Sequence, residues 1–130
     1  MNSLIEHAKN AISFSYSPYS SFKVAAAVLG DNNQIYTGVN VENASYGLTQ
    51  CAERSAICTA ISSGAKSISA IVIYTPTQSP TPPCGACRQV IQEFGANVKV
   101  HAVCDSQLCL SWTMSDLLPN SFNPEQLTNA

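Results

Sequence analysis

Two short cysteine motifs constrain this chain more than any other feature. The first is Cys51-Ala52-Glu53-Arg54 and the second is Pro83-Cys84-Gly85-Ala86-Cys87-Arg88. Each lies where the apolar pattern predicts the start of a helix. Three thiolates can hold a zinc ion and leave its fourth position open to water, which is how catalytic zinc differs from structural zinc. The two motifs therefore predict one shared metal site.

The spacing of the cysteines supports this prediction. Cys84 and Cys87 are three residues apart, so on a helix their side chains share one face and can bind one ion. Cys51 is expected to add a third sulfur from another helix. Cys58 lies about 10 Å further along that helix, too far to join Cys51 on one metal. His7 and His101 fall in no ligand-spaced pattern. The empty fourth position favours a catalytic zinc.

The residues beside the cysteines fit the same chemistry. Glu53 is predicted to reach the water on the metal and to carry its proton to the leaving group. Considered alone, a glutamate in the first helical turn more often complements the helix dipole. Arg54 is predicted to donate hydrogen bonds to sulfur and so offset the charge of three thiolates. For Arg54 and Arg88, the only arginines of the chain, the alternative is a solvated helix face.

Length and composition limit the classes of protein that the chain can belong to. At 130 residues it is expected to form one domain, residues 1–130. A net charge of −2 and a pI near 5.5 argue against nucleic-acid binding, which normally requires a basic patch. A composition of 45% hydrophobic and only 11% charged residues favours burial of surface in a homo-oligomer. The sequence shows neither a secretory signal nor an apolar run long enough to span a bilayer, so we expect a cytoplasmic location and no membrane partner.

The six cysteines are not expected to form disulfides. A chain with enough apolar residues for a core does not need them, so metal ligation plus free thiols is the better interpretation. Cys58, Cys104 and Cys109 match no ligand position and are predicted to be small buried hydrophobic residues.

The apolar pattern predicts the element order helix-β-β-α-β-α-β-β. Ser3–Glu6 matches a capping box, Thr49 is a candidate cap for the second helix, and Pro83 suits the first turn of the third. This order indicates an α/β fold, a mixed five-stranded sheet with helices on its faces. Both cysteine-bearing helices follow strands, so their N-termini can meet at one edge of the sheet. The predicted elements are helices at 3–14, 49–64 and 83–94, strands at 22–29, 34–41, 70–74, 98–103 and 108–113, helical turns at 115–118 and a tail at 119–130.

The zinc motifs have close counterparts in a known family. A Cys-Ala-Glu motif with Pro-Cys-x-x-Cys is nearly the signature of the zinc nucleobase deaminases. The chain resembles the small homotetrameric cytidine deaminases over essentially its whole length. The resemblance implies a single-domain three-layer sandwich and hydrolytic conversion of cytidine and deoxycytidine to uridine and deoxyuridine, with release of ammonia, in pyrimidine salvage. The matching segments are Ser17–Val24, Asn40–Ala44, Cys51–Arg54, Pro83–Gln89 and Leu117–Pro119.

The resemblance also implies residue roles and partners. One Zn²⁺ per subunit would be bound by Cys51, Cys84 and Cys87, with Glu53 as the proton shuttle. The resemblance implies a homotetramer, in which the other residues would contact the substrate, some of them in the site of a neighbouring subunit. Asn40 and Glu42 would bind the ribose 3′-hydroxyl, Phe22 would pack on the pyrimidine, Ala52 would contact the substrate, Ala44 and Tyr46 would reach the sugar end of a neighbouring site, and Phe122 would close over a base.

Three alternatives stay open at this point. Cys-Gly-x-Cys near a βαβ unit also suits a thioredoxin-like dithiol, although that leaves Cys51 and Glu53 without a role. A structural zinc module for protein binding is a weaker option. Blasticidin-type deaminases share the zinc motifs, but Pro18–Phe22 and Asn40–Asn43 favour a nucleoside. The four dispersed lysines argue against a nucleic-acid editor, which needs a basic channel.

Overall fold

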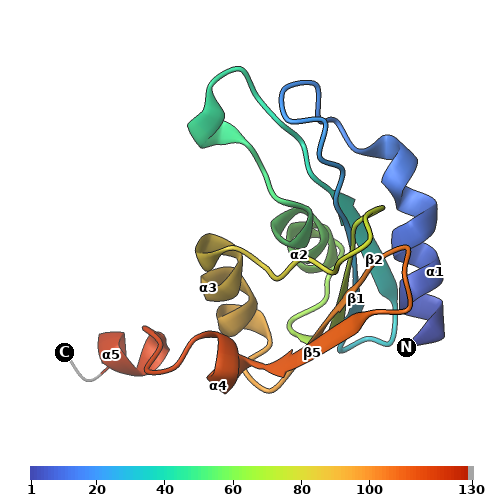
Figure 1. The fold of residues 1–130 in the computed structure, drawn as a ribbon. Coiled ribbons are helices and arrows are strands. Elements are labelled where there is room, and N and C mark those ends of the chain that lie inside the picture. Colours follow the sequence, from blue (N-terminus) through green and yellow to red (C-terminus); the bar gives the residue numbers. More distant parts are fainter. Residues whose placement is uncertain (129–130) are drawn as a thin grey trace.

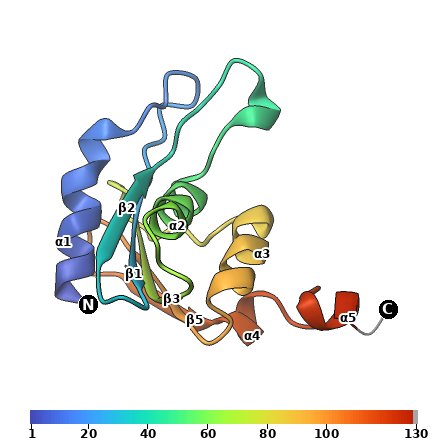
Figure 2. The ribbon, with the colours of Figure 1, turned by 180° about the vertical axis from the view of Figure 1, so that it is seen from behind.

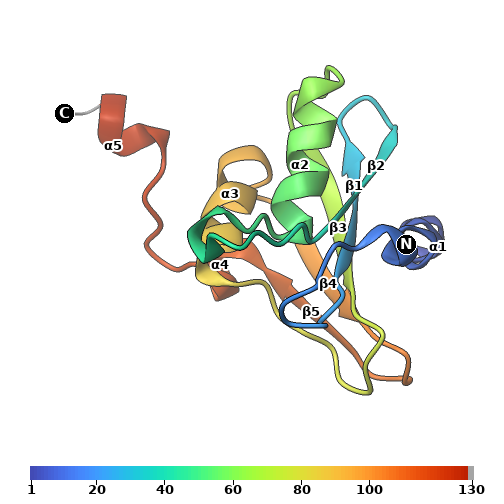
Figure 3. The same ribbon diagram turned by 90° about the horizontal axis from the view of Figure 1, so that it is seen from above.

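A mixed five-stranded sheet organises residues 1–128, the part of the chain that this computed structural model describes. The strand order is β2-β1-β3-β4-β5, and all neighbours are antiparallel except β3 and β4. Helix α1 covers one face, and α2 and α3 cover the other (Figure 1, Figure 3). The predicted α/β architecture is confirmed. The elements are α1 (Asn2–Ala11), η1 (Ile12–Phe14), β1 (Ala25–Gly30), β2 (Ile35–Val39), η2 (Tyr46–Leu48), α2 (Ala52–Ser62), β3 (Ile68–Tyr74), α3 (Gly85–Phe94), β4 (Lys99–Val103), β5 (Cys109–Thr113), α4 (Met114–Leu117) and α5 (Pro124–Thr128).

The alternation of side chains along the strands divides the core into two layers. Ala26 and Val28 of β1 pack in the cluster under α2 and α3, whereas Ala25 and Ala27 pack in the cluster under α1. Because successive residues of a strand point to opposite faces, a strand covered on both sides must be apolar throughout. This explains the unbroken apolar run of β1.

Helix α2 approaches the sheet very closely at Gly38. A Cβ added at this position of β2 would lie 2.2 Å from the Ala56 nitrogen and 2.7 Å from the Ala52 carbonyl oxygen, both backbone atoms of α2. Only glycine leaves room for this approach. The first turn of α2, which carries Glu53, is thereby fixed against the sheet.

Three helix starts differ from their predictions. Met1 caps α1 without a side-chain bond, so the predicted Ser3 capping box is wrong and Ser3 lies inside the helix. Cys51, and not Thr49, is the N-cap of α2. Pro83 was predicted to lie in the first turn of the third helix, but Cys84 is the N-cap of α3, so Pro83 precedes the helix. The helices therefore begin at the cysteines themselves. The Thr49 hydroxyl instead accepts a hydrogen bond from the Asn43 amide, at 3.3 Å.

Two other boundaries are also shifted. Strand β1 begins at Ala25, so residues 22–24 belong to the preceding loop, in which Ser21 has a φ of 58°. The predicted tail contains α5, which lies away from the sheet (Figure 2). The last two residues of that predicted tail, 129 and 130, lie outside the described residues.

The three cysteines outside the motifs do not share one environment. Cys104 is buried, as predicted, but Cys58 and Cys109 are exposed. Cys58 lies on the outward side of α2, and Cys109 lies on β5, the strand at the edge of the sheet. The prediction of burial is therefore wrong for these two. In residues 1–128 no helix is both long and apolar enough to cross a membrane.

Candidate functional site

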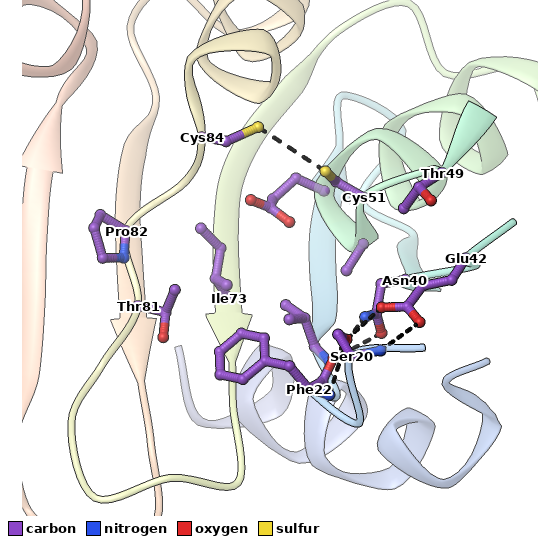
Figure 4. Close-up of a pocket in the computed structure, with 13 residues that line it drawn as sticks. Ser20, Phe22, Asn40, Glu42, Thr49, Cys51, Ile73, Thr81, Pro82 and Cys84 are labelled. Carbon is purple, nitrogen blue, oxygen red and sulfur yellow. Dashed lines mark hydrogen bonds between the residues drawn. The ribbon is translucent and has the colours of Figure 1, made fainter. Parts of the chain in front are cut away.

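Two helix N-termini meet at the predicted metal site. Cys51 caps α2 and Cys84 caps α3, both with extended backbone, while Cys87 lies in the first turn of α3. Neither cysteine side chain makes a capping hydrogen bond to the backbone of its helix. The thiols face each other instead (Figure 4), with Sγ of Cys51 3.9 Å from Sγ of Cys84. The sulfur atoms of all three cysteines lie within 4.8 Å of one another.

This geometry fits a tetrahedral zinc ion. Zinc–sulfur bonds of about 2.3 Å at tetrahedral angles separate neighbouring sulfurs by about 3.8 Å, close to the spacing of Cys51 and Cys84. Within residues 1–128, no fourth His, Cys, Asp or Glu joins the cluster. The donor set is therefore three thiolates, which are soft ligands suited to zinc.

The charge of the cluster is shared unequally among its thiols. The hydrogen bond from Cys87, followed by Arg54, lowers the pKa of the Cys51 thiol to about 5. The same contact with Cys51, and then burial, raises the pKa of Cys87. One thiol thus ionises readily while its neighbour resists, because a second negative charge would have no compensation. A bound cation would supply that compensation.

Arg54 lies beside the sulfurs, as predicted. Its Nη2 donates to the Cys51 sulfur and to the Thr49 carbonyl, both at 3.4 Å. The hydrogen bond to Cys51 raises the pKa of the guanidinium. Within the described residues, its Nε is buried without a hydrogen-bond partner. Arg54 therefore adds positive charge where three thiolates would gather.

The side chain of Arg88 hydrogen bonds to two backbone carbonyls near the second cysteine motif. Its Nε donates to the Pro83 carbonyl at 2.9 Å, and its Nη1 donates to the Leu117 carbonyl at 3.0 Å. These bonds tie the loop before Cys84 to the end of α4. The guanidinium of Arg88 therefore supports the loop that precedes Cys84 and does not lie on a solvated helix face.

Glu53 is a buried carboxyl at the edge of this cluster. It lies in the first turn of α2 and is 5% exposed. Burial raises the pKa of the Glu53 carboxyl to about 7, and the negative charge of Cys51 acts in the same direction. A carboxyl of this kind exchanges protons near neutral pH.

An open cavity of about 270 Å³ extends from the cysteines, close to the lower end of the ~300–1,000 Å³ typical of small-molecule sites. The thiols of Cys51 and Cys84 lie at one end, and Phe22, Asn40 and Glu42 lie at the other (Figure 4). The site residues predicted from the sequence that line it are Phe22, Asn40, Glu42, Cys51, Ala52, Glu53 and Cys84.

The side chain of Asn40 is largely used by the protein itself. Its Oδ1 accepts from the Ser15 hydroxyl at 2.5 Å and from the Val24 amide at 3.0 Å. Its Nδ2 donates to the Phe22 carbonyl at 2.7 Å. Of its four hydrogen-bonding positions, one N–H has no partner within the described residues.

The carboxylate of Glu42 is also held by backbone groups. Its Oε1 accepts from the amides of Tyr19 and Ser20, at 2.9 and 3.1 Å. Its Oε2 accepts from the Ser20 hydroxyl. The bond from that hydroxyl is the main cause that lowers the pKa of Glu42. Glu42 is therefore a fixed anion with acceptor capacity left on Oε2.

Three of the residues predicted to contact substrate do not line this cavity. Ala44 is exposed, and Tyr46 is 76% exposed on η2, where its ring packs edge-on against Tyr19 at 6.1 Å. Phe122 is 58% exposed, and its carbonyl accepts a hydrogen bond from Gln89 at 2.8 Å. Their predicted contacts lie in neighbouring subunits, so these roles stay predictions.

Sequence reasoning missed the rest of the cavity wall. Thr81 and Pro82 immediately precede the second cysteine motif, and this position in the sequence could have indicated that they line the site. Ser20 and Val24 lie in the Ser17–Val24 segment that matches the family, but the sequence assigned neither of them a role. The lining residues not predicted are Ser20, Val24, Thr49, Ile73, Thr81 and Pro82.

Comparison with known proteins gives concordant matches. Residues 1–103 match the family described as "Cytidine and deoxycytidylate deaminase zinc-binding region". The chain is 41% identical to a cytidine deaminase of Sporosarcina psychrophila, over 98% of this chain and 94% of the relative. It is 43% identical to a cytidine deaminase of Halalkalibacterium halodurans, over 97% and 96%.

Solved structures agree with these matches. The crystal structure of cytidine deaminase from Burkholderia pseudomallei superposes with a TM-score of 0.88 at 42% identity, covering 93% of this chain and 98% of the other. That of cytidine deaminase from Mycobacterium tuberculosis gives 0.81 at 39% identity, covering 93% and 95%.

Proposed function

The chain belongs to the cytidine deaminase family of zinc-binding hydrolases, and we propose that it converts cytidine and deoxycytidine to uridine and deoxyuridine with release of ammonia. The observation that carries the proposal is the meeting of three cysteine sulfurs from two helix N-termini beside one buried carboxyl. A dithiol oxidoreductase would need neither the third sulfur nor the carboxyl.

Cys51, Cys84 and Cys87 would hold the zinc ion. When bound, zinc lowers the pKa of a water molecule and so supplies the nucleophile. In this proposal Glu53 is the general base and general acid, since a carboxyl with a pKa near 7 can take up a proton and release it to the departing amino group. Arg54 and the two helix N-termini offset the negative charge of the thiolates.

The far end of the cavity suits the rest of a nucleoside. The Phe22 ring provides an apolar surface for the pyrimidine (Figure 4). Asn40 has one N–H to donate, and Glu42 accepts on Oε2. One sugar hydroxyl can satisfy both, accepting from the amide and donating to the carboxylate. This matches the 3′-hydroxyl, which ribose and deoxyribose share.

The negative charge of Glu42 favours an uncharged nucleoside over a phosphorylated substrate. Its pKa is lowered from 4.5, so it is ionised at neutral pH. An ionised carboxylate beside the sugar repels phosphate groups, which favours nucleosides over nucleotides and nucleic acids. The free cysteines suit a reducing compartment, and we place the protein in the cytoplasm in this proposal.

We also propose that the protein is a homotetramer whose sites are completed at subunit interfaces. Large apolar side chains are exposed on the loop around η2 and near the C-terminus. Tyr46 and Leu48 are 76% and 70% exposed, and Phe122 is 58% exposed. In the assembly, Ala44, Tyr46 and Phe122 would contact the sites of neighbouring subunits.

An ultraviolet assay of cytidine loss, with and without a zinc chelator, tests this function. We expect uridine and ammonia to form in equal amounts, activity to be lost in chelator and restored by zinc. A purified, zinc-loaded protein that leaves both cytidine and deoxycytidine unchanged would contradict the proposal.

A further inference from the structure

Ser20 connects the two parts of the cavity that would hold the nucleoside. Its amide donates to Oε1 of Glu42 at 3.1 Å, and its hydroxyl donates to Oε2 of the same carboxylate. The same hydroxyl accepts the amide hydrogen of Phe22 at 3.0 Å. All three residues line the cavity, and Figure 4 shows them together at its far end.

These bonds fix the direction in which the hydroxyl points. A serine hydroxyl has one hydrogen to donate and two lone pairs. Because the Phe22 amide occupies a lone pair, the hydroxyl cannot rotate freely and its hydrogen is directed to Glu42. The Glu42 carboxylate is therefore held on both oxygens, and the orientation that it presents to a sugar depends on Ser20.

The backbone next to Ser20 gives the connection a further role. Ser21 has a φ of 58°, in the left-handed region that residues other than glycine rarely adopt. This reversal turns the chain between Ser20 and Phe22. The bond from the Phe22 amide to the Ser20 hydroxyl spans the turn and holds it closed. One side chain, that of Ser20, thus bonds both to the backbone that carries the Phe22 ring and to the Glu42 carboxylate.

We propose that Ser20 is a positioning residue that couples the sugar-binding carboxylate of Glu42 to the base-contacting ring of Phe22. The coupling lets the enzyme bind base and sugar as one rigid unit. This inference rests on the proposed function, since it assigns Ser20 to the binding of the same nucleoside. Ser20 touches neither the cysteines nor Glu53 in the described hydrogen bonds, so its effect falls on binding and not on proton transfer.

The expected kinetics separate positioning from chemistry. Ser20→Ala removes the hydroxyl and should raise the KM for cytidine about tenfold or more, the effect of losing a hydrogen bond to a charged group. The kcat should stay within about threefold of the unsubstituted enzyme, because interactions made equally in the ground and transition states act on KM. Ser20→Thr keeps a hydroxyl and should recover most of the affinity. Ser62→Ala is the matched control, since Ser62 is exposed at the last position of α2 and does not line the cavity.

A double-mutant cycle tests whether Ser20 acts through Glu42. The kcat/KM for cytidine is measured for the unsubstituted enzyme, Ser20→Ala, Glu42→Gln and the double variant, with thermal unfolding of each. If the coupling exists, Ser20→Ala should cost about threefold or less in the Glu42→Gln background, far less than in the native one. Equal costs in the two backgrounds, or a Ser20→Ala enzyme indistinguishable from Ser62→Ala, would overturn the inference and leave the proposed function intact. An unsubstituted enzyme inactive on cytidine would overturn both.

Discussion

At the scale of single residues, the chemistry depends on one carboxyl among three sulfurs. Glu53 is 5% exposed, and burial raises its pKa to about 7. A surface glutamate would be ionised and hydrated at that pH. The sequence indicated Glu53 through its position two residues after Cys51 and through the family motif, and it gave no measure of burial. The structure supplies the physical reason why this residue suits proton transfer.

Replacing Glu53 by glutamine tests its role. The amide preserves size and packing but cannot take up and release a proton, so kcat for cytidine should fall by ~10²-fold or more while the zinc content stays near one per chain. Glu93→Gln, which changes an exposed glutamate of α3, is the control and should leave kcat unchanged. Near-normal turnover by the Glu53 variant would remove this residue from the mechanism.

At the scale of elements, the site is made by the ends of helices and by how closely they approach the sheet. Helix α2 packs on β2 at Gly38, where an added Cβ would meet the Ala56 nitrogen at 2.2 Å. Because the obstructing atoms belong to the backbone, they cannot rotate away. The same contact fixes the first turn of α2, with Cys51 and Glu53, relative to the cavity.

A methyl group at Gly38 should therefore be costly. We expect Gly38→Ala to destabilise the fold by about 3 kcal/mol or more through overpacking, which corresponds to a fall in Tm of roughly 10 °C. Gly47→Ala is the matched control, since a Cβ there meets no atom within 4 Å. The measurement is thermal unfolding of the three proteins, and equal melting temperatures would show that α2 can shift without cost.

Tyr74 joins three elements on the opposite face of the sheet. It ends β3, its hydroxyl donates to Asp105 after β4 at 2.5 Å, and Lys9 of α1 lies 5.6 Å from the centre of its ring. Burial and then the bond to Asp105 raise the pKa of Tyr74 from 10.0 to about 12. The folded protein thus keeps the phenolic proton over a range of pH in which the unfolded chain loses it.

This shift predicts a loss of stability in alkali. Between pH 10 and 12 the unfolded state binds fewer protons than the folded state, so the contribution of Tyr74 to the free energy of unfolding is complete below pH 10 and lost as the pH approaches 12. The Tm of the unsubstituted protein should fall more steeply across this range than that of Tyr74→Phe, which has no proton to lose. Parallel curves for the two proteins would contradict the assignment.

The existence and order of the elements could be predicted because apolar periodicity is local. The sequence also placed Cys51 and Cys84 at helix starts, but not as the caps themselves, since a thiol is not a usual capping group. The contacts at the far end of the cavity could not be predicted. The bonds from Ser20 to Glu42 join residues 22 apart in the chain, and they exist only once the loop has folded over the end of β2.

At the scale of the whole molecule, the apolar surface bears on assembly. Large apolar side chains are exposed on the η2 loop and in the C-terminal region. Figure 2 shows that α5, in that C-terminal region, extends away from the sheet. Such side chains are usually covered in the functional state. The homotetramer proposed above would cover them and complete each site with residues from its neighbours.

Light scattering combined with an assay of the same fractions tests the assembly. We expect the mass of four chains, and we expect dilution or Tyr46→Ala to lower kcat/KM together with the fraction of tetramer. A monomer with full activity would contradict the proposed sharing of sites between subunits.

The central claim is that sulfurs from two helices converge on one zinc whose last position is open to water. X-ray absorption at the zinc edge of the loaded protein tests it most directly. We predict three sulfur ligands at about 2.3 Å and one oxygen ligand. Four sulfur ligands, or fewer than three, would contradict the account.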